Sequence, residues 1–415
     1  MTDTSSSSTT APPPAPRAVA PRQLAWLRGE IAAWTAEGIL TEEQAARLSS
    51  RYRSEQHARV GVGRVLLYLG AGFVGVGLVW LVAANLDQLS PAARFAAVAA
   101  LWLGFLVGGE ALAARHASPP LVGALRLLAA LGAGALVFQA AQSLQVPAYE
   151  PRLVGLWSVA ALLHAYLARA HMPFLVGVAT GVTWWFMQPL WDAQDGTTVV
   201  VLLGAGSVLA AALAVLHDGW ADAFAWTWRT VAGGAALLAL FVAAIPGVGG
   251  DGPAWSTWLV LALALAAVAT VAAWAVRRGT AVLEPLGALA VLLVAVTLSL
   301  WDTGAGTSDV DGADWARAAI SILAYVVLAV ALVALGTVRD HPSLTWMAML
   351  GLVVFTTFQS FAVFAPIVTG AWLFVVLGTV FLGTGFLFDR ARRELAHALD
   401  AVEPTAPTTP NGADR

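Results

Sequence analysis

Long apolar runs separated by short polar breaks fill the chain from about residue 64 to residue 388. A helix that crosses about 30 Å of hydrocarbon needs about 20 apolar residues. Only Pro366 separates the last two runs, and the breaks at residues 169–173 and 277–285 are nearly as tight. The pattern predicts an all-α, polytopic membrane bundle of about twelve transmembrane helices, over residues 64–84, 93–113, 121–143, 152–169, 172–190, 197–216, 228–245, 255–276, 281–301, 316–337, 343–361 and 366–388.

The two ends of the chain are polar and differ from this region. Residues 1–20 are rich in Ser, Thr and Pro and contain no apolar core of a signal peptide, so they are expected to be a disordered tail. Residues 60–389 are assigned to the transmembrane domain. Residues 390–415 are expected to form a short cytoplasmic helix and a second disordered tail.

A small helical hairpin is predicted over residues 21–59, between the tail and the first span. Apolar residues recur there at three- and four-residue steps, Gly38 suits a left-handed stop, and Thr41 with Gln44 forms a capping box for the second helix. Two such short helices bury little core alone. The hairpin is therefore expected to pack on itself or on the membrane face; the alternative is that it docks a cytoplasmic partner protein through Leu27, Ile31, Trp34, Leu48 and Tyr52.

Composition supports the membrane assignment. Hydrophobic residues make up 59% and charged residues 11% of the 415, and only 24 of the 47 charged residues lie between positions 65 and 388. So few charges cannot cover a water-facing surface, which excludes soluble enzymes and nucleic-acid binders. The chain has no cysteine, so disulfides, thiolate metal sites and cysteine nucleophiles are excluded, and no cofactor or metal is expected.

Arginine, the only basic residue type besides histidine, orients the predicted spans. Cytoplasmic loops of membrane proteins carry excess Lys and Arg. If the arginine-rich N-terminus is cytoplasmic, only Arg94, Arg152 and Arg317 fall outside. We therefore expect a bacterial inner-membrane protein with both termini in the cytoplasm, and with these arginines inside: Arg115, Arg126, Arg169, Arg229, Arg277, Arg278, Arg339, Arg390, Arg392 and Arg393.

Polar side chains within apolar spans are costly and mark candidate functional sites. Gln139, Gln142 and Gln145 step by three residues at the outer end of the third predicted span and form the best candidate for a substrate or helix-contact site. His164 and Gln359 complete the candidate intramembrane polar site. Two acids also lie near the cytoplasmic face, and simple surface pairing is expected for them: Glu110 with Arg115, and Glu284 with Arg277 or Arg278.

Small residues in the spans are expected to serve helix packing. Gly70, Gly72 and Gly75 match the G-x-G-x-x-G pattern of dinucleotide sites, but they lie inside an apolar helix instead of after a strand. Such residues let neighbouring helices approach closely, and Gly104 and Gly108 are expected to act in the same way.

Two further patterns have a simple and a functional interpretation. Most tryptophans lie at span ends, as in an interfacial belt, whereas Trp184 and Trp185 could line a cavity. Arginine-to-aspartate spans recur four helices apart, ending near Asp87, Asp192 and Asp302. This echo would suit a threefold repeat, but any outward span that begins with Arg and ends with Asp would produce it, and we favour that explanation.

A set of positions spread over residues 24–170 follows a recognisable pattern: the segment from Trp34 to Ala45, Ala83–Asn85, Arg94, Gln139 and Trp157. On these positions, residues 24–170 resemble a bacterial membrane family known as domain of unknown function 2157. The chain departs from the family pattern at Leu86, where the family usually has Trp, and at Ala140–Ala141, where an aromatic–His step is usual. The resemblance implies a multi-span inner-membrane protein with a cytoplasmic helical head, and no known reaction.

Three functions fit this sequence. The first is a non-enzymatic, transporter- or permease-like carrier of an unknown solute, in contact with the lipid bilayer and without nucleic acid. The second is a membrane scaffold or sensor whose hairpin binds a cytoplasmic partner. The third, which short outer loops disfavour, is a lipid-linked transferase that uses the outer-face acids Asp87, Asp192 and Asp302.

Overall fold

A computed structural model describes most of the chain. The described residues are 17–19, 21–54, 66–75, 77, 90–145, 147, 150–190, 195–248, 252–277, 279–301, 312–364 and a few isolated positions from 375 to 390. The chain divides into two compact units, residues 1–73 and residues 74–415. Each unit is described by itself below.

The N-terminal unit contains two helices in contact with one another, α1 (Pro21–Ala36) and α2 (Glu42–Ser50). Gly38 adopts the expected left-handed conformation after α1, with φ of 73°. Thr41 and Gln44 form the predicted capping box: the Thr41 hydroxyl accepts from the Gln44 amide, and the Gln44 side chain accepts from the Thr41 amide. A short strand, β1 (Arg17–Val19), lies inside the segment expected to be a disordered tail and pairs in parallel with β2 (Tyr52–Ser54).

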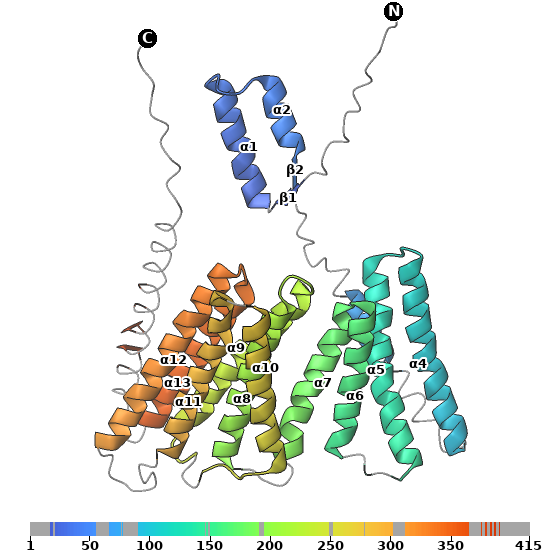
Figure 1. Ribbon diagram of the computed structural model, residues 1–415, viewed down its shortest axis with the longest axis vertical. Helices are drawn as coiled ribbons and strands as arrows, with labels where there is room; N and C mark the ends of the chain where they lie inside the picture. The colour runs from blue at the N-terminus through green and yellow to red at the C-terminus, as the bar shows by residue number, and fades with distance from the viewer. Residues whose placement is uncertain are drawn as a thin grey trace, which may run out of the picture. The chain divides into compact units, whose positions relative to one another are not determined.

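The second unit is helical throughout its described residues, and its successive helices run in alternating directions (Figure 1). Its helices are α4 (Pro91–Ala114), α5 (Pro119–Ser143), α6 (Pro151–Ala168), α7 (His171–Leu190), α8 (Gly196–His217), α9 (Asp222–Ala244), α10 (Thr257–Val276), α11 (Leu283–Leu300), α12 (Gly312–Val338) and α13 (Pro342–Phe364), with a 3-10 turn, η2 (Thr280–Val282), before α11. Ser90, Asp195 and Ser256 cap α4, α8 and α10 by accepting backbone N–H bonds.

Nine helices among the described residues are long and apolar enough to cross a membrane. They are all of α4 to α13 except α7, which has twenty residues but is not among the nine. These ten helices coincide with the second to eleventh predicted spans, so the tight breaks at residues 169–173 and 277–285 do separate helices. A helix over Leu66–Gly75 covers part of the first span, and most of the twelfth lies outside the described residues, so the count of twelve stays a prediction.

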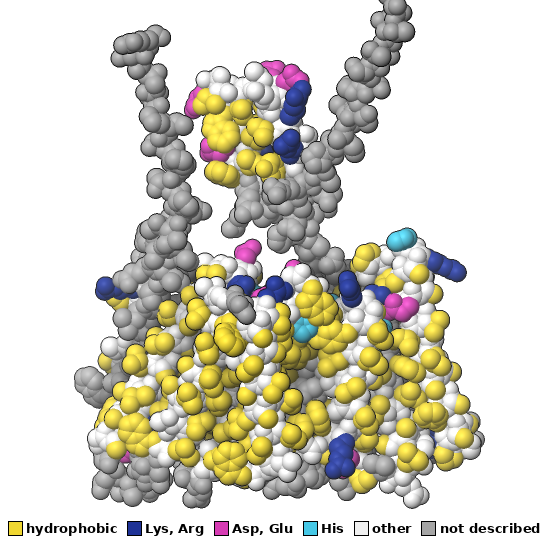
Figure 2. Space-filling model, in the orientation of Figure 1, with side chains coloured by type: hydrophobic (Ala, Val, Ile, Leu, Met, Phe, Trp, Pro, Cys, Tyr) yellow, Lys and Arg dark blue, Asp and Glu magenta, His cyan; other side chains and the backbone are white. Residues whose placement is uncertain are grey.

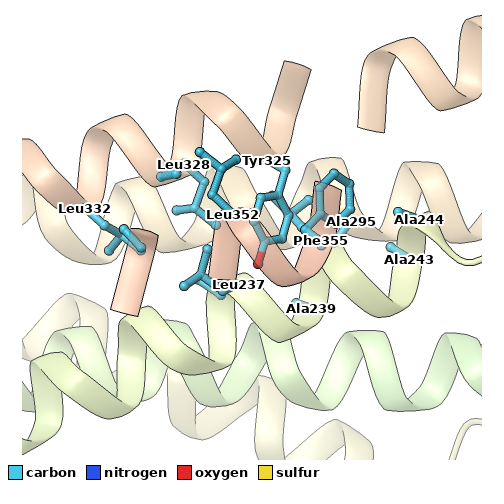
Figure 3. Packing of buried hydrophobic residues seen from close by; sticks show 14 of the residues in the cluster. Leu237, Ala239, Ala243, Ala244, Ala295, Tyr325, Leu328, Leu332, Leu352 and Phe355 are labelled. Atoms are coloured by element: carbon cyan, nitrogen blue, oxygen red, sulfur yellow. The ribbon is translucent and has the colours of Figure 1, made fainter. Parts of the chain in front are cut away.

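Helix α8 lies at the centre of the second half of this unit. It is apolar on all sides, mostly buried, and contacts α9, α10 and α11. Beside it, α9, α12 and α13 form the largest apolar cluster, in which the rings of Tyr325 and Phe355 stack with centroids 3.9 Å apart (Figure 3). Leu237 on α9 and Leu328 on α12 surround this pair of rings.

Large side chains packed into glycines hold several helices together. A Cβ at Gly134 would lie 2.4 Å from the Trp157 ring, and one at Gly204 would lie 2.4 Å from Leu292. Gly75 of the expected packing motif contacts Leu128 in the same way. Among the described residues, none lies within 4 Å of a Cβ at Gly70, Gly72, Gly104 or Gly108, so their packing role stays a prediction, while the neighbouring Gly109 lies against Leu125 and Arg126 of α5.

The packing of the helices does not follow the four-helix echo. In such a repeat, α6 and α7 would correspond to α10 and α11. Helices α6 and α7 pack closely along each other, whereas α10 and α11 each pack mainly on α8. The described helices therefore fit the simpler explanation favoured above, that any outward span beginning with Arg and ending with Asp produces the echo.

Candidate functional site

Ionic side chains gather at one end of the second unit, where α4, α6, α8, α10 and α12 finish; we call it the arginine-rich end. Figure 2 shows dark blue and magenta side chains along this edge, above helix sides that are largely yellow. The described arginines there come from five loops or helix ends: Arg115, Arg126, Arg169, Arg229, Arg277 and Arg339. These are six of the ten arginines that the sequence placed together on one side.

Four charged residues from four segments meet at this end. We call them the Arg229 network. Arg229, at the eighth position of α9, donates from Nε to Glu284 Oε2 at 2.8 Å and from Nη2 to Asp218 Oδ2 at 2.6 Å. Arg339, just after α12, also pairs with Glu284 and lies 3.6 Å from Asp218 Oδ2. Two arginines thus face two carboxylates in a closed ring of contacts.

Burial distinguishes this network from surface pairs. The side chains of Arg229 and Glu284 are each only 7% exposed. Removing such charges from water costs several kcal/mol per ion, so they persist only when paired and hydrogen-bonded. Glu284 lies in the first turn of α11, where the helix dipole favours a negative charge. Arg229 and Glu284 can therefore each stay charged and buried only while the other is present.

Two further residues join neighbouring loops to the helices of the Arg229 network. Arg277, after α10, donates to the backbone carbonyl of Asp218, which ties a fifth segment to the same loop. His341, between α12 and α13, stacks on the Trp226 ring with centroids 4.7 Å apart. Its Nε2 lies 3.2 Å from the Trp226 carbonyl oxygen. The loops at this end of the unit are therefore joined through polar groups.

A second ionic cluster, the Glu110 network, joins α4, α5 and α6. Arg126 Nε and Nη2 donate to the two Glu110 oxygens at 2.8 and 2.6 Å, a bidentate pair. His164 Nε2 lies 3.1 Å from Glu110 Oε1. The Glu110 side chain is 39% exposed, so solvent screens this network far more than the Arg229 network.

These contacts correct the expected surface pairs. The partners of Glu110 are Arg126 and His164, instead of Arg115. Among the described residues the partners of Glu284 are Arg229 and Arg339, instead of Arg277, and Arg278 lies outside the described residues. The reason is that helix packing brings the ends of different helices together, whereas proximity along the chain only places a group near the same membrane face.

His164 is thus a partner of Glu110, and the other candidate polar residues are dispersed. Gln139 is buried in α5, whereas Gln142 and Gln145 are exposed, and Gln145 follows the helix in a left-handed conformation. The Gln359 side chain is buried in α13, and its Oε1 has no hydrogen-bond partner among the described residues. No contact between these glutamines and His164 is seen in the described region.

Other predicted positions are partly accounted for. Asp87, Asp192 and Asp302 lie outside the described residues. Of the hairpin residues, Ile31 is buried, and the side chains of Leu27, Trp34, Leu48 and Tyr52 are half-buried. Among the residues described, no group of three or more His, Asp or Glu side chains could hold a metal ion.

The tryptophans proposed for a cavity serve as helix contacts. Trp184 packs against Gly155 and the Trp258 ring. Trp185 Nε1 donates to the Leu202 carbonyl at 3.0 Å, and Trp258 Nε1 donates to the Trp185 carbonyl at 3.3 Å. These contacts join α7 to α6, α8 and α10.

A hydrogen bond between the half-buried Tyr166 of α6 and the buried His217 of α8 was not predicted from the sequence. His217 Nδ1 lies 2.7 Å from the Leu213 carbonyl, which can only accept, so Nδ1 carries the proton. Nε2 is then free to accept from the Tyr166 hydroxyl at 2.9 Å. The rings of Phe174 and Phe224 surround this pair. Each of these polar groups has a hydrogen-bond partner, and the contact joins α6 to α8.

Arg317 explains one exception to the arginine asymmetry. It lies at the opposite end of the unit and is 7% exposed. Its guanidinium donates to the carbonyls of Ala243, Ile245 and Leu298 at 2.8 to 3.3 Å. These carbonyls end α9 and α11, whose dipoles favour a cation there. A carbonyl-binding role was not visible in the sequence, because the acceptors are backbone atoms of distant segments.

Comparison with known proteins gives one match. No curated protein and no solved structure is significantly similar to the chain. A family model described as "Predicted membrane protein (DUF2157)" matches residues 32–174, from α1 into the first turn of α7. The protein is a multi-pass membrane protein, and its residues 32–174 carry the signature of the DUF2157 family, as the resemblance in the sequence indicates.

Proposed function

We propose that the protein is a non-enzymatic, permease-like carrier of the bacterial inner membrane, and that the Arg229 network closes its cytoplasmic end. The observation that carries the proposal is the assembly of Asp218, Arg229, Glu284 and Arg339 from four segments into one ring of ion pairs, in which the Arg229–Glu284 pair is buried. The excess of arginine at this end supports its placement on the cytoplasmic side, with both termini inside.

The chemistry of such a network suits a contact that breaks and re-forms. Well-packed apolar side chains would hold the helix ends at least as firmly as a buried ion pair. Ion pairs near the membrane–water boundary, in contrast, can exchange their partners for water. Alternating access moves one group of helices against another around a central site. A charged ring that joins α9, α11 and α12 to the α8–α9 loop is placed to control such a movement.

The experiment uses the absence of natural cysteines. Ser207 is buried against Ala232 of α9, about 15 Å along α8 from its arginine-rich end. Ser299 is buried one residue before the opposite end of α11. Each serine is changed to cysteine in a separate protein, and the protein is labelled in oriented vesicles with a membrane-impermeant maleimide. The reagent is added on the arginine-rich side for Ser207→Cys and on the opposite side for Ser299→Cys.

Glu284→Gln should raise the labelling rate at position 207 about tenfold and lower it at position 299, because one end opens as the other closes. Glu110→Gln is the matched control and should change neither rate, since the described ion-pair partners of Glu110 lie on α5 and α6, away from the Arg229 network. Faster labelling at both positions, or no change at either, would contradict a carrier.

The alternative function is a scaffold or sensor that uses the N-terminal unit. The observation in its favour is that Trp26 on α1 and Ile39 after α1 are each 64% exposed. Deleting residues 21–54 separates the two functions. A carrier should keep its opposite responses at positions 207 and 299, whereas a sensor governed by this unit should lose them.

A further inference from the structure

We infer that His341 makes the Arg229 network sensitive to pH, so that a proton taken up by His341 loosens the arginine-rich end. This inference rests on the proposed function only in treating the network as a gate. Three features of the structure support this inference: the position of the imidazole, the tautomer that its neighbours impose, and the charges that face it.

The position of His341 couples it to the helices of the network. The residue is 2% exposed and occupies the loop between α12 and α13. Its ring stacks on Trp226, one turn before Arg229 on α9. Its backbone N–H donates to the Gly336 carbonyl at the end of α12, and its own carbonyl accepts from Leu344 in the first turn of α13. A change at this ring therefore bears on α9, α12 and α13 together.

The hydrogen bonds of His341 define a neutral ring. The Trp226 carbonyl can only accept, so Nε2, 3.2 Å away, carries the proton. Nδ1 is then the acceptor for the Ser343 hydroxyl at 2.9 Å. A protonated ring would require the Ser343 hydroxyl to turn so that it accepts from Nδ1. The second proton also places a positive charge at the start of α13, where the helix dipole opposes it.

The charged groups around His341 decide the effect of that proton. Arg229 on α9 disfavours it, Glu284 on α11 favours it, and Arg339 lies two residues away in the chain. Burial is the largest influence, and it lowers the pKa of His341 below its usual value. A protonated His341 adds a cation beside two arginines and competes with them for Glu284. The existing ion pairs then weaken.

The sign of the pH dependence follows from the lowered pKa. The unfolded chain takes up the proton near pH 6.5, and the folded protein takes it up only at lower pH. Stability from the neutral ring is thus complete above about pH 6.5 and is lost as the pH falls toward the pKa of the folded protein. Acidification should loosen the arginine-rich end.

Thermal unfolding of the full chain in detergent, between about pH 8 and about pH 5.5, tests the inference. The midpoint of the parent protein should fall with pH, and His341→Gln, whose amide can still donate to the Trp226 carbonyl, should lose about half of that fall. The matched control is His116→Gln, which removes an exposed loop histidine at the same end and should keep the full fall.

The maleimide labelling rate of the Ser207→Cys protein, divided by the rate of the denatured protein at the same pH, gives a second measurement. This relative rate should rise about threefold on acidification and should stay constant when His341→Gln is added. An unchanged pH dependence in the His341→Gln protein would overturn the inference. Its outcome is separate from that of the carrier proposal, which depends on opposite responses at positions 207 and 299 at a single pH.

Discussion

The two ionic networks at the arginine-rich end use the same chemistry in different surroundings. In the Glu110 network, the carboxylate is 39% exposed and bridges three consecutive helices. In the Arg229 network, the central arginine and glutamate are each 7% exposed and bring together segments up to 121 residues apart. The two networks therefore differ in burial and in the number of segments that they join, and not in the kinds of charge that they use.

The networks also belong to different parts of the chain. The Glu110 network lies within residues 32–174, which match the family model, whereas the Arg229 network lies entirely beyond them. The two parts are in contact where Trp184 packs against Gly155 of α6 and where the Tyr166 hydroxyl meets His217 Nε2. We therefore expect changes in one network to leave the other intact.

The largest effect is expected from Arg229→Gln, which leaves the buried Glu284 and the half-buried Asp218 with Arg339 as their remaining ion-pair partner among the described residues. The free energy of unfolding should fall by about 3 kcal/mol. Denaturant unfolding in mixed micelles measures it. Adding Glu284→Gln should recover part of the loss, because fewer buried charges then lack a partner; a loss equal to the sum of the two single changes would show that the groups act independently.

Glu110→Gln should cost only about 1 kcal/mol in the same measurement, because Glu110 is partly in contact with solvent. Arg126 and His164 remain able to reach water. A cost as large as that of Arg229→Gln would remove the distinction between the two networks.

The smallest expected effect is that of salt. Between about 0.1 M and about 1 M ionic strength the screening length falls from about 10 Å to about 3 Å. The stability difference between the parent protein and Glu110→Gln should nearly vanish at high salt, while most of the difference for Arg229→Gln should remain. Equal salt dependence of the two variants would mean that both networks are equally hydrated.

The helices could be predicted closely from the sequence, and the partners of the charged residues could not. Spans expected at 121–143 and 255–276 correspond to Pro119–Ser143 and Thr257–Val276, because long apolar runs and capping residues are local signals. Glu110 and Glu284 were found as candidates from their position in apolar segments. Their partners depend on which helices pack together, which no local pattern records.

Asp218 and His341 show the same limit. Asp218 follows α8 in a loop and reads as an ordinary surface acid, and His341 lies directly before Pro342 in a short turn. Only the packing of α9 against α12 and α13 brings Trp226 over the His341 ring. Buried backbone acceptors, such as those of Arg317, are equally invisible in a sequence.

The ratio of maleimide labelling rates at Ser207→Cys and Ser299→Cys, with and without Glu284→Gln, tests the central claim most directly. If the Arg229 network closes one end of a carrier, the ratio should rise by about tenfold or more, because the two positions respond in opposite directions. A ratio that stays constant, whether or not the individual rates change, would contradict the account and leave the network a structural contact only.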